Sequence, residues 1–315
     1  MRVSIGTAGV LGLIRVPMAV APTTAYLMVG ERCVMNCAYC AQARESESDD
    51  GALSRVTWPE FGLNRVAVSL RKAERQGLIR RCCIQVTAGQ DSYREVLRAV
   101  RRIRRSVFVP LSVAILPANM AQVEELIEAG IDSIGFGLDA AVERVFAEVK
   151  GPHWRHMLEM ITSTAERFAS IATVHLVVGL GETEREMIER MLWAQGLSLG
   201  IGLFAFTPVR GTPMAEGKQP PLRQYRRMQA ARWLIVNHGA RMTSFRFNRQ
   251  GALQGIDLAG WREALRDGVA FQTPGCPDCN RPFYNERPGG TIYNYPRPLT
   301  AKEADEALKV MEIDG

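Results

Sequence analysis

The sequence predicts an α/β fold built on a parallel sheet, a (βα)8-type, TIM-like barrel that is either complete or partial. Strand-like apolar runs alternate with helix-like segments along most of the chain, the connections between them are short, and the composition shows no break. Such a barrel carries its chemistry at the C-terminal ends of its strands. We expect an N-terminal extension (1–23), the barrel (24–250) and a C-terminal extension (251–315).

Each element follows from a local pattern. Residues 1–23 are apolar and glycine-rich without a clear period, 24–29 are strand-like, and 41–56 are a polar loop. Thr57 resembles an N-cap with Pro59 in the first turn, which predicts a helix to about Gln76, closed by Gly77. Apolar runs predict further strands at 79–87, 111–116, 133–138, 173–178, 202–206 and 241–247, and helical periodicity predicts helices at 92–105, 121–129, about 154–169 (after a short helix), 183–198 and 222–237.

The composition excludes several classes of protein. The chain has 315 residues, 47% hydrophobic and 23% charged, as in globular proteins. Its longest apolar stretch, 8–29, is broken by Arg15, Pro17 and Pro22, so we expect neither a membrane span nor a signal peptide. Four of the seven cysteines form C-x₂-C pairs, which favours reduced, metal-binding thiols in a cytoplasmic protein over disulfides.

The most informative stretch is a cysteine loop directly after the first predicted strand. Cys33, Cys37 and Cys40 have C-x₃-C-x₂-C spacing, which suits soft thiolate ligands of an iron–sulfur cluster or zinc. Zinc needs a fourth ligand close by, but the next cysteine is Cys82. Three thiolates on a four-iron cluster leave one iron open to a group with an amine and a carboxylate, and S-adenosylmethionine (SAM) has both.

With Tyr39 before its third cysteine, the loop resembles that of the radical-SAM superfamily. The resemblance implies a [4Fe-4S] cluster, bound SAM and a 5′-deoxyadenosyl radical. One further motif matches by resemblance. Gly89 and Gln90 resemble the second-strand motif that contacts the SAM amino group, although Gln90 replaces the usual Glu and a simple turn is the alternative. Asp139 ends the fourth strand, where it either binds the ribose hydroxyls or amino group of SAM or caps a helix.

The segment 175–183 resembles the G-x-I-x-G-x-x-E motif of the fifth strand, with His175 in place of the first glycine. The resemblance implies that Val177 faces adenine, that Gly179 lets the cofactor approach and that Glu182 favours the next helix. For His175 a core position is the alternative to a functional one. The loop 207–214 resembles the G-T-P loop of biotin-synthase-like enzymes, which adds Arg210 to the expected cofactor-binding residues. No side chain is assigned a catalytic role.

A second cysteine set is predicted inside the barrel. Cys276 and Cys279 form a knuckle held by Pro and Gly, which supplies only two ligands. Cys83 shares its strand parity with Gln85, so we expect it to face inward, where it would be a third ligand, and we expect Cys82 to pack against helices. A buried, inert cysteine is the alternative. The fourth ligand stays open between Arg241, a hydroxyl and a substrate atom. We expect a second, auxiliary [4Fe-4S] cluster; structural zinc and free thiols are the alternatives.

Residues 24–250 resemble biotin synthases, and the tail from Cys276 to Arg287 resembles biotin-synthase-like subunits of two-component lipoyl synthases. This implies sulfur insertion into a C–H bond of a protein-bound octanoyl-lysine, with the auxiliary cluster as sulfur donor. The implied partners are an octanoylated lipoyl-carrier protein or peptide, a second radical-SAM protein, and ferredoxin or flavodoxin as electron donor. The alternatives are a radical-SAM mutase or C–C lyase with a non-sacrificial second metal site, and an Arg-rich, metal-containing nucleic-acid-binding protein.

The net charge is +6, and arginines are densest between Arg94 and Arg105 at helical spacing. This run is either a solvated helix face or a docking patch for an acidic partner. Aromatic residues do not interleave with these arginines, so a nucleic-acid surface is not expected.

Overall fold

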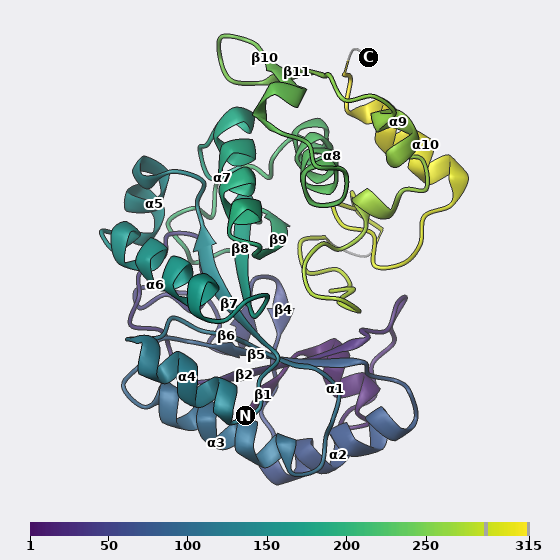
Figure 1. Ribbon diagram of the computed structural model, residues 1–315. Coiled ribbons are helices and arrows are strands. Elements are labelled where there is room, and N and C mark those ends of the chain that lie inside the picture. Colours follow the sequence, from purple (N-terminus) through teal and green to yellow (C-terminus); the bar gives the residue numbers. More distant parts are fainter. Residues whose placement is uncertain (287–288, 314–315) are drawn as a thin grey trace.

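A curved seven-stranded sheet organises the computed structural model, which describes residues 1–286 and 289–313 (Figure 1). Six adjacent strands run parallel to one another, and the short β1 pairs antiparallel with β2 at one edge. In spatial order the strands are β1 (Arg2–Val3), β2 (Thr24–Val29), β5 (Arg81–Val86), β6 (Leu111–Ala114), β7 (Ser133–Asp139), β8 (Ala172–Val178) and β9 (Gly200–Ala205). The predicted α/β class and parallel sheet are confirmed.

Helices return the chain between parallel strands and cover the outer face of the sheet (Figure 1). They are α2 (Leu63–Arg75), α3 (Ser92–Arg104), α4 (Met120–Glu128), α5 (Glu143–Lys150), α6 (Trp154–Arg167) and α7 (Glu184–Gly196). After β9, α8 (Leu222–His238) packs against α7. Local chemistry sets several boundaries. Thr183 and Glu186 form a capping box at the start of α7, and Gly239, with φ +65°, ends α8.

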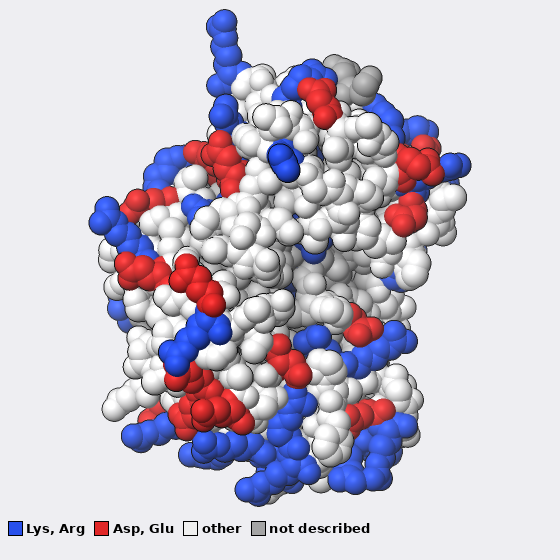
Figure 2. All heavy atoms as spheres, viewed as in Figure 1, with Lys and Arg blue, Asp and Glu red and all other residues white. Residues whose placement is uncertain are grey.

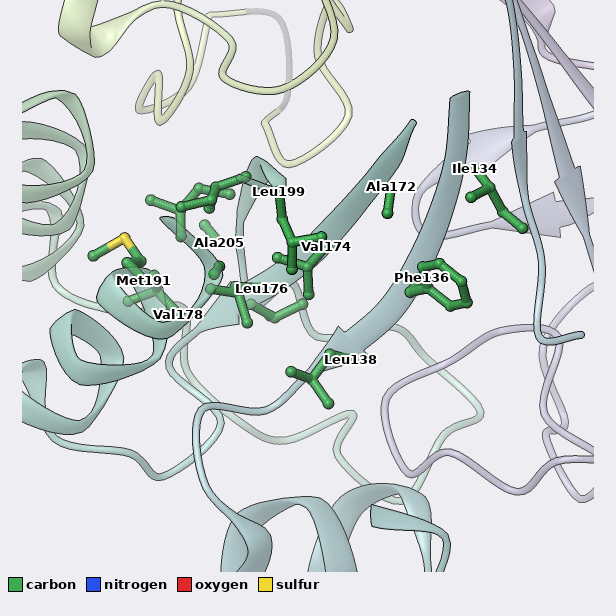
Figure 3. Packing of buried hydrophobic residues seen from close by; sticks show 14 of the residues in the cluster. Ile134, Phe136, Leu138, Ala172, Val174, Leu176, Val178, Met191, Leu199 and Ala205 are labelled. Atoms are coloured by element: carbon green, nitrogen blue, oxygen red, sulfur yellow. The ribbon is translucent and has the colours of Figure 1, made fainter. Parts of the chain in front are cut away.

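Strand parity divides the sheet into a packed face and an open face. Ile134, Phe136 and Leu138 of β7 are fully buried toward the helices, as are Val174 and Leu176 of β8 (Figure 3). The alternate residues of each strand point the other way, because successive side chains alternate across a strand. The apolar residues on one face of each strand therefore form the core, and the residues on the other face are free to line a site.

The barrel is partial on the described residues, because β1 and β9 are edge strands that do not pair with each other. The C-terminal segment 274–286 lies along this open side. Arg281 Nη2 donates to Leu203 O of β9 (3.1 Å), and Asn285 Nδ2 donates to Ala205 O (2.8 Å). On the other side, Arg281 N donates to Tyr26 Oη of β2 (2.9 Å). The segment therefore connects the edge strand β9 with β2, the strand next to the other edge.

Two predicted elements differ from the structure. Thr57 does not cap a helix: β4 (Val56–Thr57) pairs with β3 (Ala52–Leu53), and α2 begins only at Leu63. Residues 241–247 do not form a barrel strand. A 3₁₀ turn (Met242–Ser244) leads into β10 (Phe245–Phe247), which pairs antiparallel with β11 (Leu253–Ile256) away from the central sheet. A short apolar run does not reveal which strand it pairs with, and here β10 pairs with β11, its neighbour in the sequence.

The terminal regions pack onto this framework. Residues 1–23, expected as an extension, contribute β1 to the main sheet and a short helix, α1 (Ile5–Val10). Beyond β11 the described chain forms α9 (Trp261–Ala264), a 3₁₀ turn (Val269–Phe271) and α10 (Ala301–Val310), which packs on α8. None of the helices in the described part of the chain combines the length and apolarity needed to cross a bilayer.

Candidate active site

A cavity of about 700 Å³ lies between the open face of the sheet and the C-terminal segment. Both predicted cysteine sets contribute to its wall, the first through Cys40 and the second through Cys83, Cys276 and Cys279. The inward-facing residues of the strands supply further groups: Tyr26, Gln85, Asp139, His175, Val177 and Phe204.

The first cysteine loop is held by backbone hydrogen bonds to its surroundings. Cys33 N donates to Gln42 O (2.9 Å), Val34 N to Ala88 O (2.8 Å) and Ala38 N to Val149 O (2.8 Å). The contacts to Ala88 and Val149 come from the end of β5 and from α5. The loop is therefore fixed over the C-terminal ends of the strands, where the barrel rule places chemistry.

The thiols of this loop interact with one another and with a nearby cation. Burial raises the pKa of Cys37 to about 12 and that of Cys40 to about 11. Cys33 adds to both shifts by charge repulsion, and the Lys150 ammonium opposes them. A bound metal cluster favours thiolates, so its binding would release these protons.

Asp139, at the end of β7, is held by a buried network. Its Oδ2 accepts hydrogen bonds from Tyr39 Oη (2.6 Å) and Lys150 Nζ (2.6 Å), and Lys150 also donates to Gly137 O. Burial alone would raise the pKa of Asp139, but Lys150 and Tyr39 outweigh it and lower the pKa. Burial likewise opposes charge on Lys150, yet the Asp139 carboxylate raises its pKa. Both groups are therefore charged, directly beside the cysteine loop.

Removing one member of this ion pair should be costly. We expect Lys150→Met and Asp139→Asn each to lower the free energy of unfolding by about 3–5 kcal/mol, because each leaves a buried charge unpaired. In Lys150→Met the burial of Asp139 raises its pKa above the unfolded value, so the deficit should shrink as the pH falls toward about 4. Urea denaturation of the cluster-free proteins measures both effects. The double variant is the control: if its loss equals the sum of the single losses, the pair is not coupled.

The second cysteine set lies toward the other end of the strands. Cys83 is the third residue of β5, beside Tyr26 of β2 and Ser112 of β6 in the sheet register. Cys83, Cys276 and Cys279 interact electrostatically, and burial, followed by these two neighbours, raises the pKa of Cys83 strongly. Cys82 is fully buried on the opposite face. The structure thus has the orientation that strand parity predicts.

Polar contacts fasten the C-terminal knuckle to the N-terminal ends of the strands. Arg81 Nε donates to Pro277 O (3.0 Å), Thr23 Oγ1 donates to Asp278 O (2.6 Å), and Arg80 pairs with the Asp278 carboxylate (3.5 Å). Cys33, Cys37 and Cys40 lie beyond the C-terminal end of β2, so Cys40 and the knuckle reach the cavity wall from opposite ends of the strands.

Hydroxyl groups lie close to the second set, whereas Arg241, one of the candidates for the fourth ligand, does not line the cavity. Tyr26 Oη lies 3.3 Å from Cys279 Sγ, and Ser112 Oγ lies 3.8 Å from Cys276 Sγ. Arg241 is exposed beside the β10–β11 hairpin and does not line the cavity. The arginine on the cavity wall is Arg281, whose guanidinium lies 3.7 Å from the centre of the Phe204 ring.

The remaining predicted cofactor residues are distributed unevenly. Tyr39, Asp139 and Val177 line the cavity, but Gln90 and Arg210 are exposed outside its wall, and Gly89 lies in the turn before α3. Gly179 has φ +100°, and a Cβ there would lie 3.1 Å from Pro220. The group packed against Gly179 is therefore Pro220, whereas the cofactor was expected there. Glu182 accepts from Gly179 N (2.7 Å) and Leu180 N (2.9 Å) and so closes this turn. Arg287 and Pro288 lie outside the described residues.

Sequence reasoning missed three groups on or beside the cavity: Lys150, Tyr26 and Arg281. Lys150 is the last residue of a helix and resembles any C-terminal lysine, so no local signal marked it. His175, for which a core role was the alternative, lies on the cavity wall. It fits between Gly135 and Gly202, where a Cβ would come within 3.1 and 3.0 Å of its ring. Glycine at those two positions was the available clue.

Together these features define an α/β protein with two thiol-lined ends to one internal cavity. A model of the radical SAM superfamily matches residues 27–194, more than half of the chain. The chain belongs to the radical SAM superfamily, whose members bind a [4Fe-4S] cluster and SAM.

Among curated proteins, the chain is 23% identical to a biotin synthase of Picosynechococcus sp., over 78% of this chain and 68% of that protein. It is 27% identical to a lipoyl synthase of Nocardia farcinica, over 53% of this chain and 46% of that protein. The chain thus spans about half the length of that lipoyl synthase.

Two solved structures share the fold. The [FeFe]-hydrogenase maturase HydG has a TM-score of 0.55 at 15% identity, over 68% of this chain and 50% of HydG. Methylornithine synthase PylB has a TM-score of 0.54 at 10% identity, over 66% of this chain and 61% of PylB. Both likenesses concern the fold.

The residues present fit the cofactors of the family. The first set offers three thiols, and its sequence motif contains no fourth ligand, which leaves one iron of a four-iron cluster for SAM. Cys40 lines the cavity, so SAM bound there would lie inside it. Lys150 provides positive charge beside the thiolates, and Tyr39 and Asp139 provide hydrogen-bonding groups. No three His, Cys, Asp or Glu residues in the described ranges are arranged to hold a single metal ion.

Proposed function

We propose that the protein inserts sulfur into an unactivated C–H bond of a protein-bound octanoyl-lysine, as in building the lipoyl cofactor. The observation that supports this proposal is that one cavity is lined by Cys40, from the first group of cysteines, and by Cys83, Cys276 and Cys279, which form the second group. A substrate between them would have one side toward the radical source and the other toward a sulfur source.

The first group, Cys33, Cys37 and Cys40, would hold the SAM-binding cluster. When bound, this cluster and SAM supply the radical that removes a hydrogen atom from the substrate. The chain's own residues position the components. Asp139 and Tyr39 offer hydrogen bonds for SAM, and Val177 offers an apolar surface. Lys150 holds Asp139 ionised and adds positive charge beside the thiolates.

The second group, Cys83, Cys276 and Cys279, would hold an auxiliary [4Fe-4S] cluster as the sulfur donor. Three thiolates leave one iron for another ligand. Tyr26, Ser112 and Gln85 have polar atoms beside these thiols, and Arg281 lines the same cavity. Cys83, Cys276 and Cys279 are half-buried and line the cavity, which supports a role other than that of a structural zinc knuckle on the surface. The two curated relatives, a biotin synthase and a lipoyl synthase, support the same reaction class.

The deciding experiment is anaerobic reconstitution followed by turnover with SAM, a reductant and an octanoylated lysine peptide. A gain of sulfur by the peptide, seen by mass spectrometry, together with loss of sulfide from the protein, supports sulfur insertion. SAM cleavage with a rearranged or cleaved product and no sulfide loss would instead favour a mutase or C–C lyase. Salt-sensitive RNA binding without SAM cleavage would favour the nucleic-acid-binding alternative.

The arginine-rich surface of α3 is the proposed docking site for the acidic carrier protein. Arg98 and Arg105 are exposed and have no carboxylate partner in the described residues, and they flank a groove with Leu63 and Arg102. Figure 2 shows basic side chains gathered along the lower edge of the molecule, where α2 and α3 lie in Figure 1. A surface of one charge steers a partner of opposite charge.

Charge reversal tests this surface. We expect the double variant Arg98→Glu/Arg105→Glu to raise KM for the octanoylated carrier protein about tenfold at low salt. Opposite charges on two proteins speed their association, and the substitution replaces that attraction with repulsion. KM for a short neutral octanoyl-lysine peptide should stay unchanged. The matched control reverses two exposed arginines elsewhere, Arg155→Glu with Arg249→Glu. An equal effect of both pairs would refute a specific docking site, and an effect confined to the electron donor would assign the surface to ferredoxin or flavodoxin.

A further inference from the structure

One part of the cavity is apolar and is built by segments outside the two cysteine motifs. Ile5 and Gly6 of α1 line it, as do Val16, Pro17 and Met18 of the following segment and Trp58 after β4. Ile5 is 37% exposed and Met18 38% exposed, so this apolar wall reaches the surface. Apolar side chains gathered at an opening mark a binding site for an apolar group.

Packing, rather than a hydrogen-bonded ladder, shapes this wall. A Cβ on Gly9 would lie 2.5 Å from Val16 Cγ1, so the segment rests directly on the glycine face of α1. At the same end, Val3 N donates to Pro59 O (2.9 Å), which brings the start of α1 beside Trp58. The N-terminal 23 residues therefore form one wall of the cavity with the loop around Trp58.

Trp58 adds a polar requirement to this apolar wall. The residue is 3% exposed, and its Nε1–H is buried without a hydrogen-bond partner anywhere in the described chain. An unpaired buried donor is unfavourable, so an acceptor brought in with a ligand would be favoured there. Trp58 lines the cavity, so an acceptor on a bound ligand reaches the buried indole N–H only if this wall rearranges on binding.

We propose that this arm of the cavity is the subsite for the hydrocarbon chain of an acyl substrate, and that Trp58 Nε1–H donates to its carbonyl oxygen. The inference rests on the proposed function for the identity of the acyl group. A linear acyl amide supplies both features of the site, an apolar chain for the wall and one neutral oxygen acceptor for the indole. It therefore assigns to the N-terminal segment a direct part in substrate binding.

The test measures binding without turnover, so that it is independent of sulfur insertion. Peptides carrying octanoyl-lysine or butanoyl-lysine are titrated calorimetrically into the reconstituted protein with SAM and without reductant. Burial of each methylene strengthens binding about fourfold, so the octanoyl peptide should bind on the order of a hundredfold more tightly than the butanoyl peptide. Equal affinities for the two peptides would overturn the proposal, even in a protein that inserts sulfur.

Gly6 provides a matched pair of variants. A Cβ there would lie 3.5 Å from Pro22 Cγ and 3.9 Å from Met18 Sδ, ordinary contact distances, so alanine fits. Gly6→Ala should bind the octanoyl peptide like the wild type. Gly6→Phe places a ring in the arm and should weaken octanoyl binding at least tenfold, while iron content and SAM binding stay normal. Equal octanoyl affinity in the two variants would overturn the assignment of the chain to this arm.

Trp58→Phe tests the hydrogen bond, since it removes the indole N–H and keeps an aromatic wall. It should weaken octanoyl-peptide binding about two- to tenfold, the range of a single neutral hydrogen bond, without changing the ratio between the octanoyl and butanoyl peptides. Unchanged affinity in this variant would overturn the role of the indole. If the affinity rises strongly with the length of the acyl group but no sulfur is inserted, the proposed reaction is refuted and the acyl subsite stands.

Discussion

Cys83→Ala is expected to lower the iron content of the anaerobically reconstituted protein from about eight to about four per chain, because one of two four-iron clusters loses a ligand. Sulfur insertion should be lost, whereas reductive cleavage of SAM should continue at the first cluster. Cys83 contributes to the cavity wall together with Cys276 and Cys279 and interacts electrostatically with both. Iron and acid-labile sulfide analysis, with SAM-cleavage assays, measures both outcomes.

The neighbouring residue supplies the matched control. Cys82 belongs to the same strand but is fully buried on the helix side of the sheet. Cys82→Ala should keep about eight irons per chain and both activities, since it removes no cluster ligand. If Cys82→Ala loses half the iron and Cys83→Ala does not, the strand orientation assigned here is wrong. If neither loses iron, the second cluster is not bound in this cavity.

Cys40→Ala is expected to have the reciprocal effect. It should abolish reductive SAM cleavage, with a loss greater than the roughly 10–100-fold range for residues that only support a metal ligand. The second cysteine set is left intact, so about four irons per chain should remain. Cys40 is the member of the first set that reaches the cavity wall, beside Tyr39 and Asp139.

The product assay separates these roles. Cys40→Ala should yield neither 5′-deoxyadenosine nor sulfurated peptide, whereas Cys83→Ala should yield 5′-deoxyadenosine alone. Appreciable 5′-deoxyadenosine from Cys40→Ala would contradict the assignment of the first loop. The two variants together therefore distinguish a radical source from a sulfur source, which iron content alone does not.

The sequence was sufficient where the signal is local. The C-x₃-C-x₂-C spacing, the C-x₂-C knuckle and the periodicity of strands and helices are contained within a few residues each. Strand parity also indicated that Cys83 and Cys82 face opposite sides, because side-chain direction alternates along any strand. The superfamily was evident from these patterns and is shown by the match over residues 27–194.

The sequence was insufficient where a contact joins distant segments. Arg241 was one candidate for the fourth ligand, but a strand-like run does not name its partner, and this one pairs in a separate hairpin. Asp139 was a candidate because it ends a strand, but no local pattern marks Lys150, and only the fold buries the two as a pair. The start of α2 was placed too early because Thr57 and Pro59 resemble a helix start, yet Thr57 pairs with Ala52.

By itself the sequence determined the α/β class, the two cysteine sets and the likeness to radical SAM proteins, because short-range spacing and periodicity encode ligands and strand faces. Only the tertiary structure decided that the knuckle of Cys276 and Cys279 lies at the N-terminal ends of the strands, opposite Cys33, Cys37 and Cys40. It also decided that residues 1–23 form an apolar wall of the cavity. Such placements depend on packing between segments far apart in the chain, which no local pattern records.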